Sequence, residues 1–292
     1  MMSLNTFPFM QLLRRRKDMR WLLYWVTGML SAWIWNLCFL NSLSYSLLSA
    51  AIVNTFFGAS LAVVLALVLG WGIGSALHFL EQRGYRPLRG MIIFITNLIR
   101  SVPQIIGLLI GYMFLTFFIE HGILPSHVWQ IVWMSCVISV VCSLEVIDLI
   151  MERIDHYRRS DYVVAMLCCG IKESRIVHGE ILWKSSRAHL VHKAVNLFGV
   201  AIFLQCSIDF IISVGLSTDV SLSNFPATLG SLLAKLDSKQ DILAFGSMFV
   251  DPSYIPRILF LHLQGVTIAF IIVYTLVCMF QIADGLVKQY DL

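Results

Sequence analysis

An aspartate stands inside a stretch of the chain that is otherwise almost entirely apolar. Asp209 lies within residues 195–215, and Gln205 precedes it by one helical turn. A carboxylate within a membrane costs roughly 3 kcal/mol on insertion scales, so this side chain should face a partner group or an aqueous cavity. Two roles are open. Asp209 either lines a pathway and meets a cationic substrate, or it forms a structural hydrogen bond to a partner subunit.

A second candidate is the charged block at 163–185, "VVAMLCCGIKESRIVHGEILWKS", which has apolar stretches on both sides. Gly170 lies at its centre, where a reversal of the chain needs a positive φ or a close approach. Lys172, Glu173 and Arg175 follow on the exposed shoulder of that turn. The apolar residues around it are spaced as in two short helices: Ala165, Met166, Leu167, Ile171, Ile176, Ile181 and Leu182. This pattern predicts a helical hairpin with a compact charged tip, suited to a groove on a soluble partner.

The sequence offers little for other chemistry. His189 and His192 are three residues apart, but no carboxylate or cysteine completes a metal-ligand set beside them. The seven cysteines lack the spacing of a disulfide framework or a zinc site. No Walker-type glycine loop occurs, so ATP binding by that mechanism is excluded. We predict no catalytic residue, no metal and no cofactor bound by this chain.

The composition indicates that membrane-spanning helices position these residues. Of 292 residues, 58% are hydrophobic and 13% are charged, against about 25% charged in an ordinary soluble domain. The mean hydropathy is +0.80. Apolar stretches long enough to cross a bilayer of about 30 Å lie at 20–40, 50–77, 102–119, 128–148, 195–215 and 258–283. We therefore predict an all-α polytopic membrane protein with six transmembrane helices, surrounded by lipid. The net charge of +4 needs no nucleic-acid partner.

The distribution of Lys and Arg predicts the orientation of these spans. Basic residues mark the cytoplasmic side, and they are concentrated before the first span, after the second span and in 152–193. The segment 120–127 has neither Lys nor Arg, so we place it outside, together with the loop 216–257. Both termini are then cytoplasmic, with residues 1–19 as an N-terminal segment and 20–292 as one transmembrane domain.

Two apolar segments need separate treatment. Residues 86–101 contain Arg89, Asn97 and Arg100, so we expect them to lie along the cytoplasmic interface rather than to cross. The stretch "GWGIGSALHF" at 70–79 has small residues spaced to let helices pack closely.

The charged block resembles the "EAA" loop of ABC-importer permeases. Ala165 matches the first alanine of that pattern, Gly170 its glycine and Leu182 its leucine, while Val164 replaces the glutamate and Trp183 the proline. The entry to the third span, with Pro103 and Gln104, is also similar to these permeases, as is "LGSLL" at 229–233. The C-terminal "ADGLVKQYD" resembles the end of the second permease of dipeptide, oligopeptide and nickel importers. The order and spacing hold from about residue 45 to the C-terminus.

This resemblance implies a type I ABC-importer permease fold in a bacterial inner membrane. It implies four partners: a homologous second permease, two cytoplasmic ATPase subunits that bind ATP and Mg²⁺, and an extracytoplasmic substrate-binding protein. The ATPase-coupling residues would be Ala165, Gly170, Ile171, Lys172, Glu173, Arg175 and Leu182. The candidates for lining a pathway for peptide-like substrates are Pro103, Gln104, Gln205 and Asp209.

Two other functions stay open on the sequence. An ion-coupled secondary transporter would use Asp209 as a proton or cation site. A non-transporting assembly subunit would tolerate the changes in the coupling loop.

Overall fold

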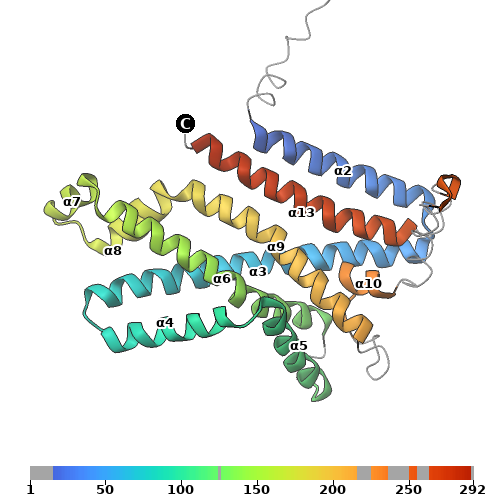
Figure 1. The fold of residues 1–292 in the computed structure, drawn as a ribbon, viewed down its shortest axis with the longest axis horizontal. Helices are drawn as coiled ribbons and strands as arrows, with labels where there is room; N and C mark the ends of the chain where they lie inside the picture. Colours follow the sequence, from blue (N-terminus) through green and yellow to red (C-terminus); the bar gives the residue numbers. More distant parts are fainter. Residues whose placement is uncertain (1–15, 124–125, 216–224, 236–249, 255–262, 291–292) are drawn as a thin grey trace, which may run out of the picture.

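The computed structural model describes residues 16–123, 126–215, 225–235, 250–254 and 263–290, which are helices joined by short turns (Figure 1). Within these ranges there is no β-strand. The helices are α2 (Lys17–Phe39), α3 (Ser42–Gln82), α4 (Arg86–Ser101), α5 (Gln104–Glu120), α6 (His127–Arg158), α7 (Asp161–Cys168), α8 (Glu173–Arg175), the π-helix η1 (Ile176–Ser185), α9 (Arg187–Gly215), α10 (Leu229–Lys235), the 3-10 helix η3 (Pro252–Tyr254) and α13 (Leu263–Tyr290).

Five helices, namely α2, α3, α6, α9 and α13, are long and apolar enough to cross a membrane, and they coincide with five of the predicted spans. The third predicted span falls on α5. It passes the same test only together with α4, and the two helices meet at 98°. The count of spans is therefore five or six, and the all-α polytopic membrane class is confirmed.

Several predicted segments fall wholly or partly outside the described residues. They are residues 1–15 of the N-terminal segment, most of the loop 216–257, and 258–262 at the start of the last predicted span. Residues 86–101 form a helix separate from α5, as expected. The location of α4 at a membrane surface stays a prediction, as does the orientation of the chain.

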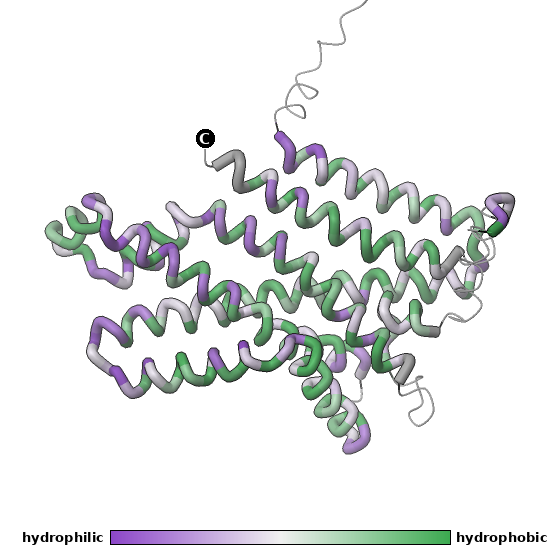
Figure 2. Tube along the Cα trace, in the orientation of Figure 1, coloured by the Kyte–Doolittle hydropathy of each residue, from purple (hydrophilic) through white to green (hydrophobic). Residues whose placement is uncertain are grey.

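The long helix α3 reaches well beyond its predicted span of 50–77. Its 41 residues correspond to about 60 Å, roughly twice the thickness of a hydrocarbon core. In Figure 2 the central part of the molecule is largely hydrophobic (green). The left end, where the α3–α4 turn and the end of α6 lie, is more hydrophilic (purple). The end of α3 thus extends into the polar end of the molecule, beside the segment between α6 and α9 (Figure 1).

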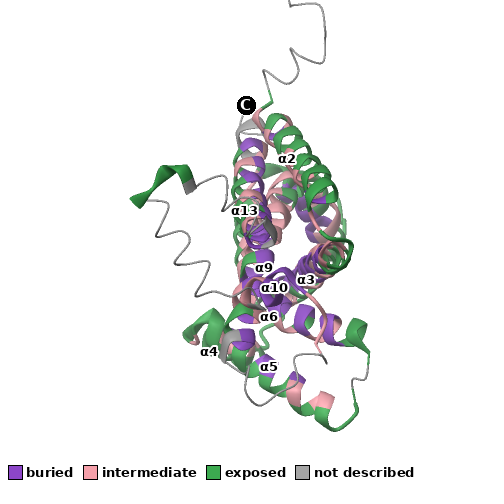
Figure 3. Cartoon of the chain, turned by 90° about the vertical axis from the view of Figure 1, so that its right-hand side faces the viewer, coloured by how far each residue is buried: buried purple, intermediate pink, exposed green. Residues whose placement is uncertain are grey.

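Small residues allow α3 to pack closely on α6, which is its most extensive helix contact. A Cβ atom at Gly70 would overlap the side chain of Val146, and one at Gly74 would lie 2.8 Å from Ile150 Cγ2. The close packing predicted for "GWGIGSALHF" is therefore confirmed. Figure 3 shows buried residues where α3, α6, α9, α10 and α13 meet, whereas α2 is largely exposed.

Replacing Gly70 by valine should destabilise the protein, because the added side chain would be forced into Val146 at the α3–α6 contact. Overpacking of this kind typically costs about 1–3 kcal/mol. Gly72, on the same helix, has nothing within 4 Å of an added Cβ, so Gly72→Val is the matched control. Thermal unfolding of the purified variants measures the difference. Equal melting temperatures for the two variants would contradict the tight α3–α6 contact.

Candidate functional sites: a helical hairpin and a buried polar pocket

The segment between α6 and α9 forms the predicted hairpin, with α7 on one arm and η1 on the other (Figure 1). The turn after α7 is a Schellman motif. The N–H of Ile171 bonds the carbonyl of Met166 at 3.2 Å, and the N–H of Gly170 bonds that of Leu167 at 3.0 Å. Gly170 has φ +78°, and an added Cβ would meet nothing within 4 Å. The glycine is therefore needed for its positive φ, as predicted, and close approach plays no part.

The base of the hairpin is buried in the protein. Ile176, Val177, Ile181 and Leu182 of η1 are 0–2% exposed, and η1 contacts both α6 and α9. Leu182, one of the predicted coupling residues, is therefore a core residue, inaccessible to a partner. The other predicted residues divide by exposure. Ala165, Gly170, Ile171, Lys172 and Arg175 are exposed, and Glu173 is half-buried.

Glu173 and His178 attach the hairpin to the end of α3. His78, which is 2% exposed, has its Nε2 3.3 Å from Glu173 Oε1, and the amide of Gln82 donates to the same oxygen. Trp71 Nε1 donates to His178 Nδ1 at 2.9 Å. The predicted exposed position on the shoulder of the turn holds only in part for Glu173, whose side chain is 33% exposed. Its carboxylate is turned toward polar groups of α3, since these offer it two hydrogen-bond partners.

Glu180 joins the two arms of the hairpin. Its carboxylate accepts hydrogen bonds from Lys184 Nζ at 2.7 Å and from Tyr162 OH at 3.1 Å. The bond from Lys184 lowers the pKa of Glu180, and the bond to Glu180 raises the pKa of Tyr162. Because the carboxyl pKa is lowered, this contact is present above the ordinary pKa of glutamate and is lost as the pH falls through the lowered value.

The tip of the hairpin exposes an apolar surface, defined here as Tyr162, Val164, Leu167, Cys168 and Ile171. Leu167 is 44% exposed and Val164 50%. In Figure 2 the segment α7 is largely green although it lies at the polar, left-hand end of the molecule. The tip is thus more apolar than the charged tip that the sequence predicted, and Lys172 and Arg175 provide its basic edge.

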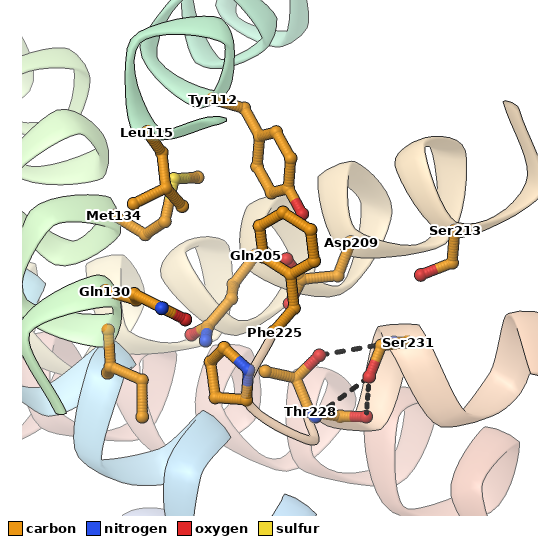
Figure 4. A pocket seen from close by; sticks show the side chains of 12 residues that line it. Tyr112, Leu115, Gln130, Met134, Gln205, Asp209, Ser213, Phe225, Thr228 and Ser231 are labelled. Carbon is orange, nitrogen blue, oxygen red and sulfur yellow. Dashed lines mark hydrogen bonds between the residues drawn. The ribbon is translucent and has the colours of Figure 1, made fainter. Parts of the chain in front are cut away.

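The second candidate site is a small polar pocket inside the helix bundle (Figure 4). Gln205 and Asp209 of α9 both line it. Opposite them are Tyr112 of α5, Gln130 of α6 and Thr228 before α10. The cavity has a volume of about 30 Å³, enough for one or two water molecules. Its size excludes a peptide from this pocket.

The structure separates the four predicted pathway residues. Pro103 and Gln104 lie at the α4–α5 bend, where they line an apolar groove with Phe203 of α9 and Phe280 of α13. None of the residues around the Asp209 pocket belongs to that groove. The four predicted pathway residues therefore belong to two separate sites in the folded protein, one pair to the groove and one pair to the pocket.

Three lining residues of this pocket, Tyr112, Gln130 and Thr228, were not predicted from the sequence. Gln130 could have been noticed in the sequence, because it is an amide within the predicted span 128–148, as Gln205 is within 195–215. Thr228 and Tyr112 carried no such signal, since both residue types are common in loops and spans. Among the described residues, no group of three or more His, Cys, Asp or Glu side chains could hold a metal ion.

Comparison with known proteins does not identify a family: no family model matches this chain, and no curated protein matches it.

Proposed function

We propose that this chain is a transmembrane permease subunit of an ATP-driven ABC importer, with a type I permease fold. In this proposal it forms half of a heterodimeric pathway with a homologous second permease and moves peptide-like substrates delivered by an extracytoplasmic binding protein. Two cytoplasmic ATPases bind ATP and Mg²⁺ and dock on the hairpin between α6 and α9. The chain itself performs no covalent chemistry.

The observation that carries this proposal is the apolar tip surface on a buried, firmly attached base. Large exposed apolar patches mark interaction sites, and this one lies at the polar end of the molecule, near the α3–α4 turn (Figure 2). In this proposal that end of the molecule is outside the lipid. A soluble partner is the cover that fits this location. The basic Lys172 and Arg175 beside the tip add a preference for an acidic groove.

The attachments of the hairpin would let a partner move the transmembrane helices. Displacement of the tip reaches α3 through Glu173 and His178, and it reaches α6 and α9 through the buried face of η1. These helices form the centre of the bundle, so a push on the tip would shift the bundle between two packings, as in alternating access.

A cysteine at Lys172 tests the docking. The variant is made in a background without the seven native cysteines, because Cys168 and Cys169 are themselves exposed at the tip. We expect it to crosslink to a co-expressed ATPase in the assembled complex. The control is a cysteine at Ile123, which is 59% exposed in the turn after α5 and should not crosslink. Absence of a crosslink from every position between Gly170 and Val177 would overturn the proposal.

The half-buried carboxylate of Asp209, whose Oδ2 is not in contact with solvent, favours a second candidate function, an ion-coupled secondary transporter. Proteoliposomes that contain this chain and no ATPase distinguish the two. Uptake driven by a cation or proton gradient would favour the secondary transporter, whereas uptake only after addition of ATPase and ATP would favour the importer.

A further inference from the structure

On α9, two oxygen atoms at the Asp209 pocket lack a hydrogen-bond partner among the described residues. They are Oε1 of Gln205 and Oδ2 of Asp209, and neither is in contact with solvent. The Gln205 side chain belongs to a residue that is only 3% exposed. Both atoms are acceptors, so an occupant that satisfies both must supply positive charge or donor hydrogens.

The carboxylate also lacks a counter-charge within the described part of the chain. None of the ion pairs there includes Asp209. A buried charge without a partner is strongly unfavourable in a medium of low dielectric constant. One positive charge in the pocket would restore neutrality, whereas a divalent ion would leave an uncompensated positive charge.

The size and the donors of the pocket restrict the occupant further. The cavity of about 30 Å³ admits a dehydrated monovalent ion but has no room for an amino acid. Figure 4 shows the Tyr112 hydroxyl near the Asp209 carboxylate and the Gln205 amide beside that of Gln130, and all four residues line the pocket. The hydroxyl-bearing side chain of Thr228 lines the same pocket as Asp209. Carboxylate, amide and hydroxyl oxygens are the donors that hard cations prefer.

Close backbone contacts hold the walls of the pocket in place. A Cβ at Gly230 would lie 2.8 Å from Cys206 Cα, so the segment after Thr228 is pressed against the backbone of α9. At Gly58 of α3 the contact is with a side chain instead: an added Cβ would lie 3.0 Å from Oε1 of Gln205. The oxygen donors are thus arranged before any ligand arrives.

We propose that Asp209 and Gln205, with the hydroxyl groups of Thr228 and Tyr112, bind one monovalent alkali cation. The site joins α5, α9 and the segment before α10, so the ion stabilises the packing in which these segments meet. This inference does not depend on the proposed ATPase docking, because every residue in it lies within the bundle.

Thermal unfolding of the full chain in phosphatidylcholine nanodiscs tests the site at neutral pH. Sodium, potassium and N-methylglucamine chlorides are compared at constant ionic strength. We expect sodium or potassium to raise the Tm by about 2–4 °C over N-methylglucamine, with saturation, and Asp209→Asn to abolish the rise. Asp148→Asn is the control, because Asp148 is an exposed carboxylate paired with Arg100 at 2.5 Å, and this variant should keep the rise.

An identical Tm in the three salts would overturn the site, since it would leave only a proton or water in the pocket. A cation-dependent rise that survives in Asp209→Asn would overturn it as well. If Asp209→Asn does not fold, equilibrium binding of radioactive sodium and rubidium to the wild-type chain decides. Saturable binding of one ion per chain supports the site, and no saturable binding of either ion overturns it. No ATPase is present in these experiments, so failure of the importer proposal would not affect them.

Discussion

Aspartate in place of Leu167 should abolish stable binding of the proposed ATPase partner. Leu167 is 44% exposed in the tip surface, so docking would bury much of an aliphatic side chain. Loss of that burial costs about 1.5–3 kcal/mol, and desolvation of the new carboxylate adds to it. Since 1.4 kcal/mol is a factor of ten, we expect the affinity to fall by about 100-fold or more.

Co-purification with co-expressed ATPases and ATP-dependent uptake measure this loss. Leu43→Asp is the matched control, because Leu43 is an aliphatic residue, 72% exposed, at the start of α3 and at the opposite end of the molecule from the tip (Figure 1). Both variants should melt close to the wild-type temperature, since neither side chain is buried. Normal co-purification and uptake by Leu167→Asp would contradict docking at the tip.

Alanine in place of Gly230 should destabilise the protein and disturb the pocket. The atoms nearest to an added Cβ are the carbonyl oxygen, the Cα and the carbonyl carbon of Cys206. They belong to the backbone of α9, which cannot rotate away as a side chain can. Overpacking against side chains typically costs about 1–3 kcal/mol, and we expect the upper end of that range or more here, a fall in Tm of about 6 °C or more.

A shift of α10 away from α9 would not relieve the overlap between the added Cβ and the backbone of Cys206 without a further cost. Leu229 N donates to Thr55 Oγ1 at 3.0 Å, and Asn54 donates to the carbonyl of Ala227 at 2.9 Å. A shift of α10 would therefore break two bonds to α3. Gly107→Ala is the control, because Gly107 is a helical glycine with nothing within 4 Å of an added Cβ, and it should be neutral or slightly stabilising. A wild-type melting curve for Gly230→Ala would contradict this close contact.

Much of the fold could be predicted from residue type and periodicity. Within the described residues each predicted span falls largely on a helix, and 86–101 forms a helix separate from α5. Gly170 was identified as the point of chain reversal, and its φ of +78° follows from a local rule about glycine. The small residues at Gly70 and Gly74 likewise indicated close packing on α6 before any partner helix was known.

The candidate sites were predicted less well, because their geometry depends on contacts between distant segments. Glu173 looked like a tip residue, yet it is held by His78, which is 95 residues away. Leu182 was predicted to be an ATPase-coupling residue, yet it is fully buried. The charged tip became an apolar one because the chain turns Val164 and Leu167 outward while Ile176 and Ile181 fill the core.

By itself the sequence determined the membrane class, the helices and the place of the chain reversal, since these follow from local hydropathy and backbone preference. Only the tertiary structure decided which polar groups share the Asp209 pocket, because Tyr112, Gln130 and Thr228 come from segments that are far apart in the chain. It also decided which face of the hairpin is free. That choice is made by packing against α3, α6 and α9, and no short window of sequence contains those contacts.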